Sequence, residues 1–439
     1  MKPYPIYKPS GVPWLGDVPA HWEIKKVKYI ASLSGQKTDR VVLGTRYVGL
    51  EHVIPGAGRF VEDTDGMQAE AESTVNVFSE GDVLFGKLRP YLAKSVVADT
   101  NGVCSSEFLV LRPCEDVNAR YLNAGLLLEG FIKTVDASTF GAKMPRADWG
   151  FISQLCLPLP LPDEQQAIAD YLDTETARID ELMREKQGLI GLLREYRQTV
   201  IADLTTGLGR TDAKTPTGNV FCPNVPTDWM MVRLGKYSRI GNGSTPLKDN
   251  AGYWEAGTFP WLNSAVVNQD EVREGSEMVT DEALRACHLP IVEPGAVLVA
   301  LTGQGKTRGQ ATVLRIQATI NQHLAFISLD TERFDSDYVF WTLTGMYGAL
   351  RMVSDGQGGT KGALTCEDLS QFEVPMPPLA VQRAIAQTVA YETARIDDLI
   401  SHTNDEIGLL KELRAATIAD AVLGRIDVRT ADLTAHIAH

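Results

Sequence analysis

Two long stretches of the chain place apolar side chains three or four residues apart, which is the spacing of one face of an α-helix. The first stretch, from Asp163 to Thr206, contains no proline, and its apolar positions are Ile179, Leu182, Met183, Leu189, Ile190, Leu193, Tyr196, Val200, Ile201 and Leu204. The second stretch follows the sequence PMPP, and its apolar positions are Ile396, Leu399, Ile400, Ile407, Leu410, Leu413 and Ile418. The pattern predicts two long helices, each with one continuous apolar stripe.

A helix as long as the first stretch would span roughly 65 Å at about 1.5 Å per residue, which is too long to be buried in one small domain. We therefore expect the two stripes to pack on each other as an antiparallel coiled coil. The positions that we assign to this packing, or to a bound partner, are Ile179, Leu182, Leu193, Ile396, Leu399 and Leu410. The alternative, in which each helix packs only on the domain beside it, stays open at this stage.

Outside the helices the pattern changes to short apolar and β-branched runs, such as DVLFG and LAFISLD, separated by Gly, Pro, Asn and Asp. We interpret these regions as two globular domains of mixed α/β structure. The predicted boundaries are module 1 at residues 1–157, a helical region at 158–208, module 2 at 209–374, a second helical region at 375–428 and a C-terminal tail at 429–439.

The chain is an internal repeat. The hexamer ETARID occurs at Glu175 to Asp180 and again, 217 positions later, at Glu392 to Asp397. At the same offset GLLREYRQTVIAD faces GLLKELRAATIAD, and EQQAIADY faces VQRAIAQT. The modules match more weakly, as in VPAHWEIKKV and VPTDWMMVRL. Two divergent modules that alternate with two similar helices predict a pseudo-two-fold arrangement.

Composition places the chain among globular proteins, with 44% hydrophobic and 22% charged residues in a length of 439. This length calls for at least two domains. The sequence has no apolar run of 18 residues and no apolar signal core, so we expect a cytoplasmic protein without a membrane span. Six cysteines without a C-x-x-C pair fit buried thiols and predict no metal site.

One stretch of module 2, ALTGQGKT from Ala300 to Thr307, satisfies the relaxed pattern of a phosphate-binding loop. Such a loop lies between a strand and a helix, whereas RGQATVLRI, which follows here, predicts a returning strand. Histidines such as His52, His288 and His323 stand alone, and no nucleophile motif is present. These patterns indicate a binding protein with no catalytic residues.

Basic side chains interleaved with aromatic or amide residues fall on two predicted loops of each module, a composition suited to contacts with phosphates and base edges. In module 1 the candidate DNA-binding residues are Lys87, Arg89, Tyr91, Lys94, Lys143 and Arg146. In module 2 they are Gln304, Lys306, Thr307, Arg308, Gln357, Thr360 and Lys361. The alternative for each residue is an ordinary solvated surface position. Under the DNA-binding hypothesis, Arg89→Ala or Arg308→Ala weakens binding.

The net charge of −14 opposes a nucleic-acid partner. Residues 158–208 hold 10 acidic and 5 basic side chains, so the first helical region contributes a large part of this charge. We therefore expect the chain alone to bind DNA weakly, and we expect a partner to supply further positive charge.

The complete arrangement resembles the DNA-specificity subunit of Type I restriction-modification systems, and the resemblance covers essentially the whole chain. It rests on PLPLPDEQQAIADYLDTETARIDEL and its second copy, on GDVLFGKLRPYLAK, on GNGSTPLKDNAGYWEAGTFPWLN, on LTGQGKTRGQATV and on VLGRIDVR near the C-terminus.

The resemblance implies that each module reads one half of a bipartite, asymmetric DNA target while the helices set the spacer between the halves. It also implies partners, namely two methyltransferase subunits that use S-adenosylmethionine and restriction subunits that use ATP and Mg²⁺, with no cofactor bound by this chain. A competing hypothesis is a coiled-coil scaffold whose modules bind protein.

Overall fold

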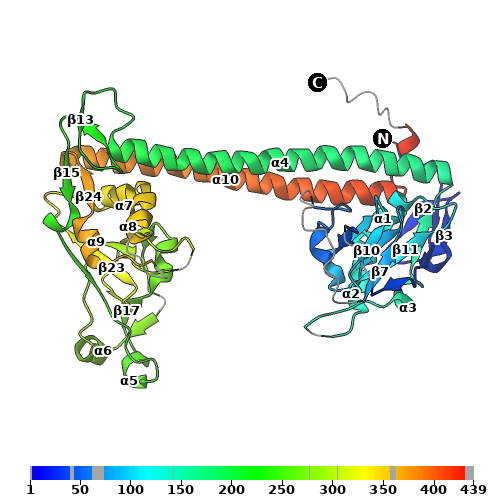
Figure 1. Cartoon of the computed structure of the whole chain (residues 1–439), viewed down its shortest axis with the longest axis horizontal. Coiled ribbons are helices and arrows are strands. Elements are labelled where there is room, and N and C mark those ends of the chain that lie inside the picture. The colour runs from blue at the N-terminus through cyan, green and yellow to red at the C-terminus, as the bar shows by residue number, and fades with distance from the viewer. Residues whose placement is uncertain are drawn as a thin grey trace. The chain divides into compact units, whose positions relative to one another are not determined.

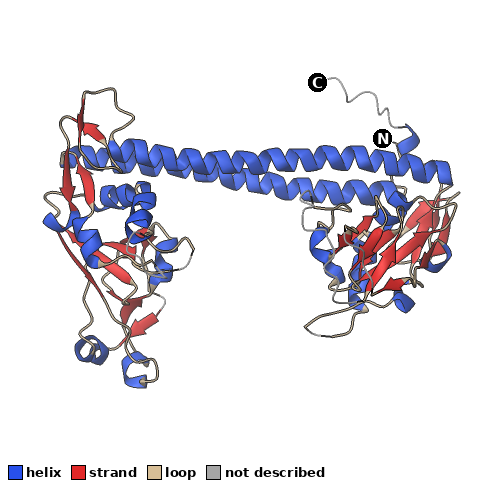
Figure 2. Cartoon of the chain, in the orientation of Figure 1, coloured by secondary structure: helices blue, strands red, loops and turns tan. Residues whose placement is uncertain are grey.

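A computed structural model describes residues 2–39, 44–61, 74–141, 143–275, 277–303, 305–355 and 362–430 (Figure 1). It divides into two compact units: unit 1 combines Met1–Lys186 with Asn404–His439, and unit 2 is Gln187–Thr403. Each unit therefore contains one module and part of each long helix. Helices and strands are mixed in both modules, which confirms the predicted fold class (Figure 2).

The two predicted helices are present. Helix α4 spans Pro162–Thr206 and α10 spans Leu379–Val422. Proline occupies the first position of α4, where no intrahelical N–H bond is lost. Gly207 and Gly424 follow the two helices with φ of +71° and +68°, the left-handed conformation that ends many helices.

The two helices run antiparallel within unit 1 (Figure 1). Asp180 of α4 pairs with Arg414 of α10, and Lys186, further along α4, pairs with Glu406, which is nearer the start of α10. In unit 2 Arg197 of α4 pairs with Asp397 of α10. The predicted antiparallel coiled coil is thus confirmed within each unit.

Module 1 has two four-stranded sheets, in the orders β4-β11-β8-β9 and β5-β7-β10-β6, and two pairs of strands, β1-β2 and β12-β3. Its strands are β1 (Tyr7–Pro9), β2 (Asp17–Pro19), β3 (Glu23–Lys26), β4 (Ala31–Leu33), β5 (Lys37–Thr38), β6 (Tyr47–Val48), β7 (Val75–Phe78), β8 (Val83–Gly86), β9 (Ser95–Val97), β10 (Gly102–Cys104), β11 (Phe108–Pro113) and β12 (Cys156–Leu159). Its helices are η1 (Val27–Tyr29), η2 (Leu50–His52), η3 (Pro90–Leu92), α1 (Ala119–Leu126), α2 (Glu129–Ala137) and α3 (Trp149–Ile152), and η6 (Val428–Thr430) follows α10.

Module 2 has a five-stranded sheet in the order β16-β23-β20-β21-β18, a three-stranded sheet, β19-β17-β22, and the pairs β13-β14 and β15-β24. Its strands are β13 (Lys214–Pro216), β14 (Asn224–Pro226), β15 (Met230–Arg233), β16 (Ser238–Asn242), β17 (Phe259–Leu262), β18 (Glu271–Val272), β19 (Glu277–Val279), β20 (Val297–Ala300), β21 (Ala311–Leu314), β22 (Thr319–Ile320), β23 (Leu324–Leu329) and β24 (Glu373–Met376). Its helices are η4 (Leu234–Lys236), α5 (Ala251–Trp254), η5 (Ser264–Asn268), α6 (Asp281–Ala286), α7 (Ser336–Gly345), α8 (Tyr347–Asp355) and α9 (Cys366–Gln371).

Each module shares a hydrophobic core with both helices. In unit 1 the core around Trp22 includes Ile168 of α4 and Ile418 of α10. In unit 2 the core around Trp229 includes Ile201 of α4 and Val389 of α10. The two arrangements weighed from the sequence therefore occur together, because each helix packs on a module and on the other helix.

A buried glutamine fixes the start of each long helix to its module. The side chain of Gln165 accepts a hydrogen bond from the Asn118 backbone (2.9 Å) and donates to the carbonyls of Asp116 (3.1 Å) and Pro160 (2.9 Å). Gln382, at the 217-residue offset, makes the equivalent three bonds, at 2.9, 2.8 and 2.9 Å, to partners at the same offset. The sequence repeat is thus also a repeat of individual hydrogen bonds.

A buried carboxylate of unit 1 contacts residues near both ends of the described part of the chain. Glu164 of α4 accepts a hydrogen bond from the Tyr4 hydroxyl (2.6 Å) and lies 3.0 Å from His21 Nε2. Arg429, beyond the end of α10, approaches the same carboxylate at 3.8 Å and also binds Asp427. The N-terminal and C-terminal segments therefore meet at the start of α4.

Candidate nucleic-acid interface

The first cluster of candidate residues in module 1 lies on the connection from β8 to β9. Lys87 and Lys94 are partly buried, whereas Arg89 and Tyr91 are exposed. Arg89 has φ of +51°, a left-handed conformation that costs a non-glycine residue about 1–2 kcal/mol. Such strain often marks functional loops, where the surrounding structure holds a side chain in a fixed direction.

The second cluster of module 1 is brought to the first by backbone pairing. The Arg89 N–H donates to the Pro145 carbonyl at 2.8 Å, and the Ala147 N–H donates to the Lys87 carbonyl at 2.9 Å. Lys143 is exposed on the same segment. Two loops that are separated by about fifty residues in sequence therefore form one surface.

Not every basic residue on this surface is free to contact a phosphate. Arg146 donates to both carboxylate oxygens of Glu107 at 3.0 Å, and this hydrogen bonding lowers the pKa of Glu107. The Lys94 ammonium donates to the Leu50 carbonyl at 2.6 Å. These two residues hold the loops in place, while Lys87 and Arg89 remain the better candidates for phosphate contact.

In module 2 the connection from β20 to β21 is a hairpin between antiparallel strands, so the returning strand predicted after ALTGQGKT is confirmed. Lys306 is exposed and Thr307 is half-buried. Arg308 is only 5% exposed and pairs with Asp355 of α8. The structure thus gives Arg308 an internal partner, which the sequence did not indicate.

The Leu364 N–H donates to the Leu301 carbonyl at 2.8 Å, so the described residues after the second loop of module 2 are bonded to the start of the first. The remaining candidates lie outside the described residues: Gln304, Gln357, Thr360 and Lys361.

Several residues of this surface carry no sequence signal that we recognised. Arg351 donates to the Gly305 carbonyl at 2.6 Å, and the Tyr347 hydroxyl donates to the Lys306 carbonyl at 2.8 Å, so α8 supports the loop of module 2. In module 1 Phe140 and Met144 are 80% and 50% exposed on the segment that carries Lys143. An apolar residue in a predicted loop is not part of a periodic pattern, so nothing in the sequence singled out Phe140 or Met144.

The helix positions assigned to packing have different exposures. Ile179 and Ile396 are buried at the repeated hexamer, and Leu182, Leu193 and Leu410 are partly buried. Leu399 is 55% exposed, so it does not pack between the helices, and of its two assigned roles contact with a partner stays a prediction. The neighbouring Thr403 is buried instead, with its hydroxyl donating to the Leu399 carbonyl.

The outward face of each long helix carries an exposed apolar pair at equivalent positions of the repeat. On α4 the pair is Leu192 and Tyr196, at 65% and 57% exposure. On α10 the pair is Leu409 and Leu413, at 64% and 49% exposure. The spacing of four residues places the members of each pair on one side of their helix.

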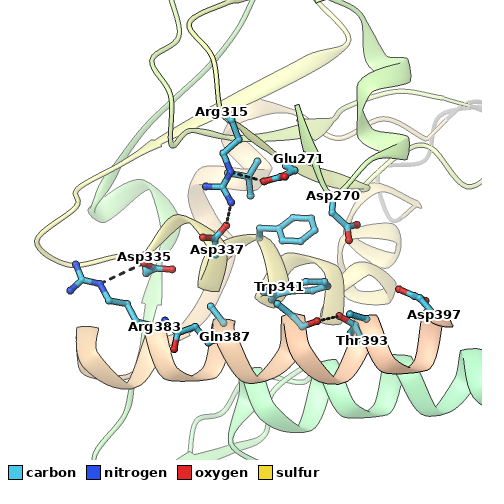
Figure 3. A pocket seen from close by; sticks show the side chains of 15 residues that line it. Asp270, Glu271, Arg315, Asp335, Asp337, Trp341, Arg383, Gln387, Thr393 and Asp397 are labelled. Carbon is cyan, nitrogen blue, oxygen red and sulfur yellow. Dashed lines mark hydrogen bonds and ion pairs between the residues drawn. The ribbon is translucent and has the colours of Figure 1, made fainter. Parts of the chain in front are cut away.

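Unit 2 also contains a crevice of 550 Å³ between its module and α10 (Figure 3). Arg315 bridges Glu271 and Asp337 across it, while Asp270 points into it and has a pKa raised by burial. The corresponding space in unit 1 is smaller, 230 Å³, and there Arg414 donates to the carbonyls of Gly56 and Ala57. In the larger crevice Arg315 pairs with Glu271 and Arg383 with Asp335, and in the smaller one Arg120 pairs with Asp173.

The part of the chain that the structure describes contains no group of three or more His, Cys, Asp or Glu side chains placed to hold a metal ion. A search of its helices also finds none that is long and apolar enough to cross a membrane.

Two segments, residues 61–190 and 226–409, match the family model of the Type I restriction modification DNA specificity domain. The chain belongs to this family. Its two modules are the two recognition domains of a DNA-specificity subunit, a class of subunit that performs no catalytic step itself.

Curated relatives of low sequence identity are also specificity subunits of Type I restriction enzymes. The chain is 19% identical to the Type I restriction enzyme MjaIX specificity subunit of Methanocaldococcus jannaschii over 430 residues, which cover 94% of this chain and 95% of that protein. It is 23% identical to the EcoBI specificity subunit of Escherichia coli over 317 residues, covering 68% and 64% of the two chains.

Solved structures share the fold. A chain from a structural study of complex assembly in a Type I restriction-modification system matches with a TM-score of 0.74 and 20% identity, covering 93% of this chain and 99% of that one. The HsdS subunit of Thermoanaerobacter tengcongensis matches with a TM-score of 0.54 and 21% identity, covering 93% and 98%.

Proposed function

We propose that this specificity subunit reads a bipartite, asymmetric DNA target, with one half-site contacted by module 1 (residues 1–157) and the other by module 2 (residues 209–374). The helical regions 158–208 and 375–428 would set the number of unread base pairs between the half-sites, and residues 429–439 would be a tail. The DNA contacts would come from the loops that carry Lys87, Arg89 and Tyr91 in module 1 and Lys306 in module 2.

The observation that carries this proposal is that the two halves of the chain repeat the same individual interactions although their modules diverge. Asp180 pairs with Arg414 and Asp397 pairs with Arg197, and each pair is the 217-residue counterpart of the other. Gln165 and Gln382 anchor the two helices in the same way. A constant framework that presents two different surfaces is what a two-part, asymmetric target requires, because each surface can be changed without disturbing the other.

We infer further that two methyltransferase subunits dock on the outward apolar pairs of the helices, one on Leu192 with Tyr196 and one on Leu409 with Leu413. Exposed apolar pairs at equivalent positions of a repeat suit two copies of one partner. These subunits would bind S-adenosylmethionine and transfer its methyl group to adenine, and restriction subunits would add ATP- and Mg²⁺-dependent activity. This chain would bind none of these cofactors and would act in the cytoplasm.

The proposed partners would also explain how an acidic chain takes part in DNA binding. A chain with net charge −14 gains little from counterion release when it binds DNA alone. We expect tight binding only from the assembled complex, in which the methyltransferase subunits contribute basic surface.

The test is a map of methylated adenines in cells that express this chain together with its methyltransferase subunit, compared with cells that express the methyltransferase alone. A split motif that depends on this chain would support the proposal and would supply both half-sites and the spacer. A stable complex that produces no motif would instead favour the scaffold hypothesis.

A further inference from the structure

A short hairpin in module 1 exposes two apolar side chains beside the basic loop. Phe140 and Arg146 pair as an antiparallel bridge, with backbone N–H to O distances of 3.4 and 3.3 Å, and Gly141 turns the chain with φ of +98°. Phe140 has the largest exposed fraction, 80%, of the aromatic side chains in the described part of the chain. Met144, on the returning side of the hairpin, is 50% exposed.

The base of this hairpin is held firmly. The Arg146 guanidinium binds Glu107 of the sheet region through two hydrogen bonds of 3.0 Å. Arg146 also forms a β-bridge with Leu88, and Pro145 accepts the Arg89 N–H. A hairpin that is fixed at its base loses little conformational entropy when its exposed end binds something.

The surroundings of the two side chains favour nucleic acid over protein as the ligand. The hairpin carries Lys143 and is hydrogen-bonded to the loop that carries Lys87 and Arg89. Two apolar side chains among cations suit a DNA groove, where phenylalanine and similar residues contact the 5-methyl group of thymine.

We propose that Phe140 and Met144 form an apolar finger that packs against thymine methyl groups in the half-site contacted by module 1, an inference that rests on the function proposed above. The finger contributes base discrimination, while Lys87 and Arg89 supply the charge that positions the duplex.

The two modules differ at this position of the repeat. The bond from Ala147 to Lys87 in module 1 corresponds to that from Leu364 to Leu301 in module 2, at the 217-residue offset for the donor. At that offset Gln357 stands for Phe140 and Lys361 for Met144. Apolar contact with thymine is therefore a property of module 1, and module 2 uses polar side chains at the equivalent positions of its sequence.

The test measures binding of the complex of this chain with its methyltransferase subunits to duplexes of the mapped target. Each thymine of the half-sites is replaced in turn by deoxyuridine, which lacks only the 5-methyl group. With the unsubstituted chain, at least one replacement in one half-site should weaken binding about fourfold, as expected for one methyl group removed from an apolar contact.

Phe140→Ala should weaken binding to the thymine duplex about tenfold and should abolish the difference between thymine and deoxyuridine. Phe140→Leu, which keeps an apolar side chain, should retain that difference. The matched control is Tyr29→Ala, since Tyr29 is a 64% exposed aromatic on η1, which is hydrogen-bonded to residues 153–155 and not to the hairpin; its binding should be unchanged.

Deoxyuridine replacements without effect, or with the same effect in Phe140→Ala, would overturn the finger while leaving sequence-specific binding and the proposed function intact. Loss of assembly with the methyltransferase in Phe140→Ala would also overturn it and would point to a protein contact. If the unsubstituted complex binds no specific sequence, the proposed function itself fails, and this result is distinct from the others.

Discussion

The carboxylates that end the repeated hexamer, Asp180 and Asp397, have the same partner type but different environments. Asp180 is 5% exposed and binds Arg414, whose guanidinium also donates to Gly56 and Ala57. Asp397 is half exposed and binds Arg197. A buried pair leaves an uncompensated charge when one partner is removed, whereas a pair in contact with water does not.

We therefore predict that Asp180→Ala lowers the stability of the protein by about 3–5 kcal/mol, and that Asp397→Ala, the matched control, lowers it by about 1 kcal/mol or less. Thermal unfolding of the two variants measures the difference. Equal melting temperatures would show that burial does not separate the two pairs.

Arg89 and Arg308 lie on corresponding loops of the two modules, but Arg89 is exposed and Arg308 is buried. Arg89→Ala should weaken DNA binding by the assembled complex and should lower the slope of log affinity against log salt by about 0.9, since one phosphate contact is lost. Arg308→Ala should mainly reduce stability, by about 1–2 kcal/mol, because this side chain is buried against Asp355. Titrations at three or more salt concentrations separate the two outcomes. A changed slope for Arg308→Ala would show that Arg308 contacts a phosphate after all.

The sequence could show which residues are basic, but it could not show which of them are free. Arg308 is buried because α8 supplies Asp355, which lies 47 positions away. Arg146 is paired because Glu107, 39 positions away, lies beside it. Such pairs depend on how distant segments pack, and this packing cannot be inferred from the local composition.

Among the elements, the long helices were the best predicted, because a period near 3.6 residues is legible over forty positions. Their interior was less well predicted. Apolar positions repeated at a fixed spacing drift slowly around the axis of an α-helix. Some positions that face the other helix are therefore polar, such as the buried Thr403 and Arg414. This drift explains why Leu399 faces outward although its spacing fits the stripe.

If the helices set the spacer, their length should change the target in one respect only. Removing seven residues from each, 185–191 of α4 and 402–408 of α10, shortens each helix by about 10 Å, or roughly three base pairs, and leaves the exposed apolar pairs in place. The map of methylated adenines should then show the same half-sites with a shorter gap. New half-site bases with an unchanged gap would contradict the division of labour between helices and modules.

A single deletion, of residues 185–191 alone, is the control for this experiment. It removes the residues from one helix and leaves the other at its full length, so the antiparallel pairs can no longer all form. We expect it to impair assembly and to yield no motif.

At the scale of the whole molecule, the contacts at the chain ends hold the terminal segments of unit 1 together. Asp427 accepts three hydrogen bonds from Arg429, which lower the pKa of its carboxyl group, and its own N–H donates to the Lys2 carbonyl at 2.9 Å. A lowered folded-state pKa adds stability above the ordinary aspartate value of about 4, and this stability is lost as the pH falls through the folded value.

We therefore predict that Asp427→Asn melts at a lower temperature than the unsubstituted protein at pH 7 and that the difference closes as the pH falls below about 4. Melting curves between pH 3 and pH 7 test this prediction. A difference that persists unchanged at pH 3 would mean that the asparagine disturbs packing, not charge.

The equivalence of Gly207 and Gly424 has one more consequence. After α4 the chain turns at Gly207 against Pro226 and runs directly into module 2; after α10 it turns at Gly424 against Pro19, at the entrance of module 1, but there the backbone is not continuous. Each repeat therefore ends in the same turn against the start of a module. A gene for one repeat alone could therefore encode a chain that pairs with its own copy, and the sequence that such a homodimer recognised would be a palindrome.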